Sequence, residues 1–257
     1  MEYQTIKGES VPSLGLGTWR MSGRQCEAAV EKALALGYRH IDTARMYGNE
    51  TEVGRAIRSS GVDRGEIFLT TKLWTDDFTA ERVPRATRES LEELSTDYVD
   101  LLLMHWPSSS VPLGETLGAM NELQQQGKVR HVGVSNFSPA LVEEAAEHAT
   151  VFCNQVEYHP HSPRAELLEQ AREMDYLLTA YSPVAKGRLL DDATLREVAE
   201  SRGKSAAQVA LRWLVQQEKV AAIPKASSED HLESNLDVFD FTLTDDEVRR
   251  ISEAARP

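Results

Sequence analysis

Short apolar runs recur along the chain, and each interval between them has room for one helix. The runs that predict strands lie near 14–18, 39–42, 67–72, 99–104, 131–135, 151–155, 177–181 and 220–223. Apolar runs of this length, bounded by polar residues, are typical of strands buried in a parallel sheet. Eight such strands alternating with helices predict an α/β fold, namely a parallel (β/α)8 barrel.

The segments between these runs repeat their apolar residues with helical spacing. In 25–36, one helical face carries Cys26, Ala29, Val30, Ala33 and Leu34. Gly37 follows as a signal for the end of that helix. Further helices are expected near 79–94, 205–217 and 244–255. Pro84 is compatible only with a first helical turn, and Ser205 is a candidate N-cap.

Length and composition narrow the class of protein. The chain has 257 residues and no linker or low-complexity segment, so we expect a single domain over 1–257. Its two cysteines, Cys26 and Cys153, lie far apart in sequence, which favours reduced thiols in a cytoplasmic protein. No apolar run approaches the roughly 18 residues of a membrane span. The net charge of −13 argues against a nucleic-acid partner.

Four residues of complementary chemistry stand at or just beyond the ends of successive predicted strands. Asp42 and Tyr47 belong to YRHIDTARMYGNE, Lys72 to IFLTTKLW and His105 to DLLLMHWP. Because barrel active sites collect at the carboxyl ends of the strands, we expect these side chains to lie on one face.

These four residue types together suit proton transfer at a carbonyl group. A tyrosine hydroxyl titrates near ~10, and an ammonium beside it, such as Lys72, is expected to lower its pKa. Asp42 would hold Lys72, and His105 would donate a hydrogen bond to the carbonyl oxygen. Taken singly, each residue has a plainer interpretation, as a helix cap, a solvated lysine or a packed core histidine. The set suits reduction of an aldehyde or ketone if a hydride comes from elsewhere.

Other catalytic classes find weaker support in the sequence. The segment GLGTWR (15–20) has two glycines of a dinucleotide fingerprint but ends in arginine, so it is a near miss. His159 and His161 flank Pro160, and we interpret both as loop residues rather than metal ligands. No metal site is predicted.

The order of longer blocks resembles the aldo-keto reductases from about residue 5 to about residue 255. The matching blocks are GLGTW (15–19), GYRHIDTARMYGNE (37–50), LTTKLW (69–74), DYVDLLLMHWP (97–107), GKVRHVGVSNF (127–137), NQVEYHP (154–160), AYSPVAKG (180–187) and IPKASSEDHLESN (223–235). The short loops are most similar to the prokaryotic 2,5-diketo-D-gluconate reductase branch, whose members also reduce methylglyoxal. The resemblance implies a monomer, a hairpin before Gly15 that covers the barrel floor, and a small-molecule carbonyl substrate.

The resemblance also implies NADPH as the cofactor. By position, Ser135, Asn136 and Gln155 would hold the carboxamide, and Tyr181 would stack under the nicotinamide. The other implied contacts are Thr18, Asp42, Ser182, Val184, Lys225, Ser227, Ser228, His231 and Asn235. The family usually has arginine where this chain has His231, and arginine is a better partner for a 2′-phosphate. We therefore expect a weakened NADPH preference, with NADH also used.

The resemblance implies a carbonyl pocket with aromatic walls. Its residues would be Trp19, Tyr47, Trp74, His105, Trp106 and Asn136. The chain ends at Pro257 without the closing loop of longer relatives, so we expect an open pocket for small aldehydes and dicarbonyls. Two alternatives remain: a cofactor-binding regulatory subunit of the same fold with little turnover, and a metal-dependent barrel hydrolase or isomerase.

Overall fold

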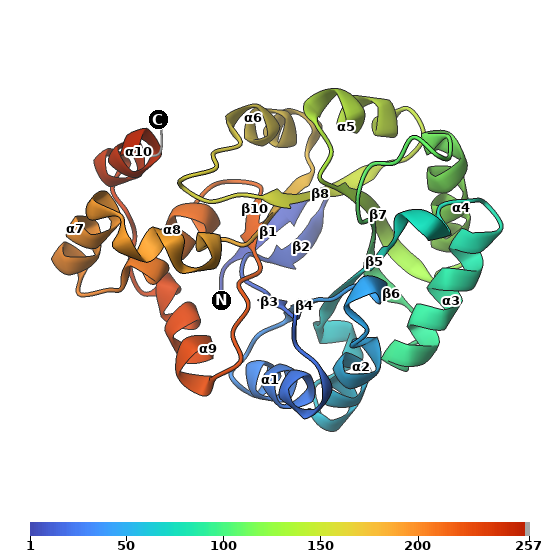
Figure 1. Ribbon diagram of the computed structural model, residues 1–257, viewed down its shortest axis with the longest axis horizontal. Coiled ribbons are helices and arrows are strands. Elements are labelled where there is room, and N and C mark those ends of the chain that lie inside the picture. Colours follow the sequence, from blue (N-terminus) through green and yellow to red (C-terminus); the bar gives the residue numbers. More distant parts are fainter. Residues whose placement is uncertain (255–257) are drawn as a thin grey trace.

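The computed structural model describes residues 1–254, and a sheet of eight parallel strands lies at its centre. In spatial order the strands are β10 (Val220–Ala222), β9 (Leu177–Tyr181), β8 (Val151–Glu157), β7 (Val129–Ser135), β6 (Val99–Met104), β5 (Phe68–Leu73), β4 (His40–Asp42) and β3 (Leu16–Gly17). Spatial order follows chain order throughout. A parallel bridge between Leu14 and Ala222 joins the two ends of the sheet, which closes the predicted barrel (Figure 1).

Helices surround the barrel. They are α1 (Gly23–Ala35), α2 (Glu50–Ser59), α3 (Arg82–Leu94), α4 (Leu113–Gln125), α5 (Pro139–Ala146), α6 (Ala165–Met174), α7 (Ala193–Arg202), α8 (Ala206–Val215), α9 (Glu229–Leu236) and α10 (Asp245–Ala254). Figure 1 shows α7 to α10 gathered on one side of the molecule, at the left of the view. Short 3-10 turns connect several elements, namely Arg45–Tyr47, Arg64–Glu66, Thr75–Asp77, Ala185–Asp191 and Asp237–Phe239.

The local signals for helix ends are confirmed. Gly37 follows α1 with a φ of 101°, a conformation that glycine adopts without steric cost. Helix α3 begins at residue 82, so Pro84 falls in its first turn, as predicted. Ser205 caps α8 in a reciprocal capping box with Gln208. The predicted end of the last helix, at residue 255, and the end of the predicted domain lie outside the described residues.

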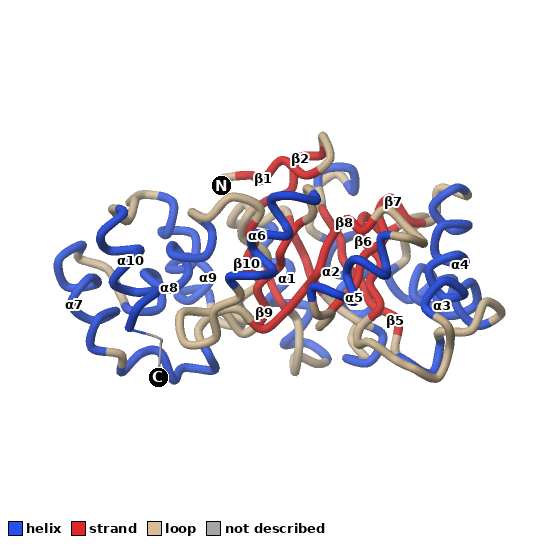
Figure 2. The backbone as a smooth tube through the Cα atoms, turned by 90° about the horizontal axis from the view of Figure 1, so that it is seen from above, coloured by secondary structure: helices blue, strands red, loops and turns tan. Residues whose placement is uncertain are grey.

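An antiparallel hairpin closes one end of the barrel. It consists of β1 (Tyr3–Ile6) and β2 (Glu9–Pro12), and Figure 2 shows it lying across the ends of the barrel strands. Ile6 and Val11 are fully buried against side chains that fill the barrel interior, including Leu101, Phe152 and Leu177. The floor of the barrel is thus sealed by apolar packing, which leaves the carboxyl ends of the strands as the open end.

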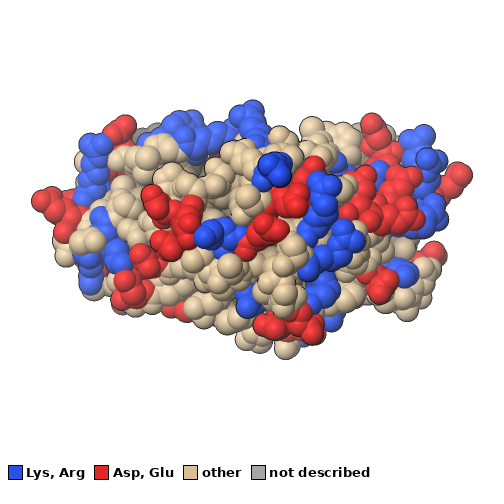
Figure 3. Space-filling model, turned by 90° about the horizontal axis from the view of Figure 1, so that it is seen from below, with Lys and Arg blue, Asp and Glu red and all other residues tan. Residues whose placement is uncertain are grey.

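Acidic and basic side chains are interspersed on the face shown in Figure 3. Ion pairs also join neighbouring elements, such as the pair of Arg250 with Glu197. No helix within residues 1–254 has both the length and the apolar character needed to cross a membrane.

Candidate active site

A cavity of about 700 Å³ opens at the carboxyl ends of the strands. Most of the residues that the sequence singled out line it: Trp19, Asp42, Tyr47, Trp74, His105, Trp106, Ser135, Asn136, Gln155, Tyr181, Ser182, Val184 and Lys225. Lys72 and Thr18 lie directly behind this lining, and both are fully buried. The barrel therefore brings the four candidate catalytic residues together.

Strand register places the acidic and basic members of this group on one face. In the parallel pair of β4 and β5, Asp42 lies opposite Thr70. Lys72 follows Thr70 by two residues, and side chains two apart on a strand point to the same side. Asp42 and Lys72 form an ion pair. Because both residues are buried, this pair lies in the barrel interior.

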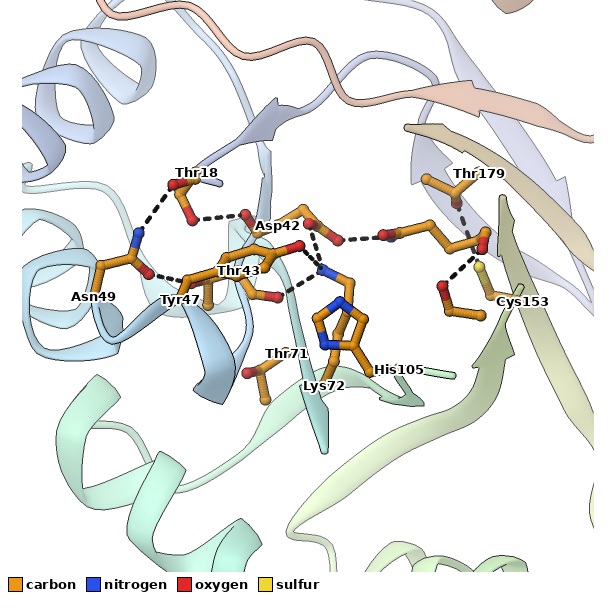
Figure 4. A network of polar contacts seen from close by, with 12 residues as sticks. Thr18, Asp42, Thr43, Tyr47, Asn49, Thr71, Lys72, His105, Cys153 and Thr179 are labelled. Carbon is orange, nitrogen blue, oxygen red and sulfur yellow. Dashed lines mark hydrogen bonds and ion pairs between the residues drawn. The ribbon is translucent and has the colours of Figure 1, made fainter. Parts of the chain in front are cut away.

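The Lys72 ammonium is satisfied by three acceptors (Figure 4). Nζ donates to Asp42 Oδ1 at 2.6 Å, to the carbonyl of Thr43 at 2.7 Å and to Tyr47 Oη at 3.4 Å. A buried charge is tolerated when it is paired and its hydrogen bonds are made. The ammonium is therefore fixed in place beside the phenol.

The loop that carries Tyr47 is held by a buried amide. Tyr47 ends the 3-10 turn Arg45–Tyr47. Just beyond the turn, Asn49 accepts from Thr43 Oγ1 at 2.7 Å and donates to the carbonyls of Thr18 and Met21 at 2.9 and 3.0 Å. These bonds tie the Tyr47 loop to the ends of β3 and β4.

Burial governs the charge state of Tyr47. It raises the pKa of the phenol, whereas the charge and hydrogen bond of Lys72 lower it without cancelling the shift. Lys72 therefore lowers the pKa of Tyr47 as expected, but burial, which the sequence does not show, outweighs it and leaves the net shift upward. The phenol keeps its proton at neutral pH. Burial alone would lower the pKa of Lys72, but Asp42 and Tyr47 together raise it, so Lys72 stays charged.

His105 follows β6 and faces the phenol. Its ring lies edge-on to the rings of Tyr47, at 5.7 Å between centroids, and Trp74, at 5.2 Å. Burial, with a smaller contribution from the charge of Lys72, lowers the pKa of His105 to about 3. Nδ1 is buried and has no hydrogen-bond partner among the described residues. A neutral imidazole with one N–H therefore lines the cavity next to a protonated phenol.

Asn136 connects three strand ends. Its Nδ2 donates to the carbonyl of His105 at 3.2 Å and to Ser135 Oγ at 3.0 Å, and Tyr181 Oη donates to its Oδ1 at 2.8 Å. Asn136 and Ser182, which follow β7 and β9, have φ values of 64° and 49°. Left-handed backbone at non-glycine residues is strained and tends to occur at functional sites.

Gln155, on β8, contacts both the Asp42 carboxylate and the cavity. Nε2 donates to Asp42 Oδ2 at 2.7 Å, and its backbone carbonyl accepts from Ser135 Oγ at 2.7 Å. With Lys72 on Oδ1, both oxygens of Asp42 are occupied.

The cavity lining also carries positive charge. Arg20, Lys186 and Lys225 line it, together with Ser182 and Val184. The guanidinium of Arg20 lies 4.3 Å from the centre of the Trp19 ring, and Lys186 Nζ lies 5.4 Å from it. A cavity lined by aromatic rings, polar groups and three cations fits a ligand that joins a flat ring to phosphate groups.

Four predicted residues lie outside this cavity lining, on or just before α9: Ser227, Ser228, His231 and Asn235. Ser228 caps the helix by accepting from the backbone N–H of His231 at 3.4 Å. Glu229, which begins this helix, pairs with Lys32 at 2.6 Å. The acidic character of this segment is therefore partly offset.

Several lining residues were missed at the level of sequence. Met46, Arg20, Glu157 and Lys186 line the cavity, and Met46 is 60% exposed. Their positions depend on the paths of loops, which leave no periodic signal. The available hint was proximity, since each lies in or directly beside a block that carries predicted site residues.

Comparisons with known proteins show the family and the fold of the chain. The model of the "Aldo/keto reductase family" matches residues 13–256. An aldo-keto reductase of Mycolicibacterium smegmatis is 42% identical over 250 residues, which cover 95% of this chain and 90% of that protein. A glyoxal reductase of Bacillus subtilis is 40% identical over 247 residues, 95% of this chain and 89% of that protein. A solved structure provisionally identified as a 2,5-diketo-D-gluconic acid reductase B superposes with a TM-score of 0.97 at 47% identity, covering 100% of this chain and 92% of that one.

Proposed function

Because the chain belongs to the aldo/keto reductase family, whose members act on carbonyl groups and generally use NAD(P)H, we propose that it reduces small aldehydes and ketones to alcohols. The proposed substrates include dicarbonyls such as methylglyoxal and sugar acids such as 2,5-diketo-D-gluconate. The observation that carries the proposal is the buried Lys72 ammonium between Asp42 and the phenol of Tyr47, beside a neutral His105.

In the proposed reaction, the chain's own groups bind the carbonyl oxygen and deliver a proton to it. His105 donates an N–H to that oxygen and holds it near Tyr47, which transfers its phenolic proton to the oxygen as the alcohol forms. Lys72 stabilises the phenolate that remains, and Asp42 keeps Lys72 in place. A bound reduced nicotinamide supplies the hydride that completes the reduction.

The proposed cofactor site extends along the cavity. Ser135, Asn136 and Gln155 would hold the carboxamide, and Tyr181 would stack under the nicotinamide ring. Thr18 and Asp42 would contact the ribose, and Ser182 and Val184 would line the pyrophosphate path. The adenosine end is assigned to Lys225, Ser227, Ser228, His231 and Asn235. Trp19, Trp74 and Trp106 form the substrate walls. The cations along the cavity support this assignment, because a dinucleotide brings phosphate charge there.

Replacement of Tyr47 by phenylalanine tests the proposed proton donor. Tyr47→Phe is expected to lower kcat by several orders of magnitude and to leave cofactor affinity nearly unchanged, because only the transferable proton is lost. The measurement is cofactor oxidation with methylglyoxal, with wild type and variant in parallel. Wild-type protein that binds cofactor tightly but turns over no carbonyl would instead favour a regulatory subunit.

Cofactor preference is a separate prediction. We propose NADPH as the preferred cofactor with substantial use of NADH, because His231 offers one donor where arginine would offer a charged fork. His231→Arg is expected to raise the ratio of kcat/KM for NADPH over NADH. A wild-type ratio above about a thousand would contradict the proposal.

We further propose a monomer in the cytoplasm. Both cysteines, Cys26 and Cys153, are free and buried. Burial raises the pKa of each thiol to about 12, so neither is reactive at neutral pH. Size-exclusion chromatography with light scattering tests the monomer directly.

A further inference from the structure

Gln155 contacts Asp42 in addition to its proposed contact with the cofactor carboxamide. It is 2% exposed and reaches from β8 to Asp42 on β4, a residue 113 positions earlier. Nε2 lies 2.7 Å from Asp42 Oδ2, the distance of a strong, charge-assisted hydrogen bond. This bond links two strands that are not neighbours in the sheet.

The contact fixes the orientation of the amide. An ionised carboxylate only accepts hydrogen bonds, so Gln155 must turn its NH₂ group toward Asp42. Its Oε1 makes no hydrogen bond within residues 1–254 and belongs to a residue that lines the cavity. Gln155 therefore offers the cavity an acceptor while its donor holds Asp42.

The same contact fixes the orientation of Asp42. Lys72 holds Oδ1 at 2.6 Å and Gln155 holds Oδ2 at 2.7 Å, so the carboxylate is held from two sides. Loss of one side frees the carboxylate to rotate. The contact most sensitive to such a change is the longest in the chain of bonds, between Lys72 Nζ and Tyr47 Oη at 3.4 Å.

We propose that Gln155 is a positioning residue for catalysis: it holds Asp42, and through Asp42 it sets the place of Lys72 beside Tyr47. This role rests on the proposed function and is distinct from binding of the cofactor carboxamide. One amide thereby couples the seating of the cofactor to the alignment of the proton donor.

Two substitutions separate positioning from cofactor binding. Gln155→Met keeps the length of the side chain and loses its hydrogen bonds. We expect kcat at saturating cofactor to fall about tenfold or more, because misalignment of a catalytic group acts on turnover. We also expect the alkaline limb of the kcat profile for reduction to move to higher pH, since Lys72 then stabilises the phenolate less well.

Gln155→Glu adds a dependence on pH. When protonated, the introduced carboxyl can still donate to Asp42; when ionised, it repels Asp42. The ratio of wild-type to variant kcat is therefore expected to grow as pH rises.

Thr179→Val is the matched control, because Thr179 lies opposite Gln155 in the register, is also buried and contacts only Cys153 through its hydroxyl. Its kcat profile should match wild type.

A change confined to the KM or Kd for the cofactor in Gln155→Met, with kcat and its pH profile unchanged, would overturn the proposal.

A double-mutant cycle of Gln155→Met with Asp42→Asn, measured by urea unfolding, tests the contact without turnover. Non-additive shifts in the unfolding midpoint support the proposal, and additive shifts refute it. Absence of wild-type turnover would refute the proposed function alone, and the cycle would still decide whether Gln155 holds Asp42.

Discussion

Two buried nitrogen bases of the candidate site have opposite charge states. Lys72 stays charged because Asp42 compensates its burial, whereas His105 is neutral because no carboxylate faces its ring. The same buried environment thus supplies a cation to Tyr47 and an uncharged donor to the proposed substrate. The difference comes from one contact, the 2.6 Å ion pair between Lys72 and Asp42.

The neutrality of His105 predicts how stability responds to acid. Its pKa is about 3 in the folded chain and near ~6.5 when unfolded, so the unfolded state binds more protons between these values. The contribution of the neutral His105 ring to the free energy of unfolding is fully present above about pH 6.5. It decreases as the pH falls toward 3. His105→Gln should reduce this slope by up to about 1.4 kcal/mol per pH unit in urea unfolding. An unchanged slope in His105→Gln would contradict the neutral state.

Packing between neighbouring helices depends on single glycines. On α2, a Cβ at Gly54 would overlap the backbone of Leu94 at the end of α3. On α4, a Cβ at Gly118 would meet nothing within 4 Å. The two glycines have the same helical environment but different neighbours, so they separate helix propensity from close packing.

This pair predicts opposite effects of one substitution. Gly118→Ala should stabilise the chain by about 0.5–1 kcal/mol, because alanine loses less backbone entropy in a helix. Gly54→Ala should destabilise it by about 1–3 kcal/mol, because α2 and α3 must move apart. Denaturant unfolding of the two variants measures both. Stabilisation of the chain by both changes would show that the α2–α3 contact yields without cost.

Signals within one element were readable from the sequence, and contacts between elements were not. The stripe of α1, the cap at Ser205 and the position of Pro84 each rest on neighbouring residues, so the pattern predicted them. The four candidate catalytic residues were found because each stands at or just beyond a strand end. The bond between Gln155 and Asp42 spans 113 residues, and no local pattern marks it. The raised pKa of Tyr47 likewise depends on burial by distant segments.

Over the whole molecule, the apolar cluster that seals the floor and the residues of the candidate site lie at opposite ends of the barrel. The hairpin and the lower interior form an apolar cluster that contains Ile6 and Val11, while the charged and polar groups of the site gather at the carboxyl ends. Barrels generally separate the two in this way. Changes at the floor are therefore expected to affect folding without affecting turnover.

Ile6→Ala tests this separation. Loss of a fully buried isoleucine should lower the free energy of unfolding by about 2–5 kcal/mol. Under conditions where the variant is folded, kcat/KM should stay within about twofold of wild type. Tyr3→Ala, at a 52% exposed residue of the same strand, is the control and should change stability little. A large loss of kcat/KM in folded Ile6→Ala would show that the floor supports the site directly.

The turn between β1 and β2 lies at the floor of the barrel (Figure 2), whereas the cavity is lined by residues at the carboxyl ends of the strands. Lys7 and Gly8 form this turn, with φ values of 48° and 86°, and both are exposed. A molecule attached to a solid support through this turn would present the cavity to the liquid rather than to the surface. Uniform orientation would then make every immobilised copy accessible to a flowing substrate, which a random attachment through surface lysines would not.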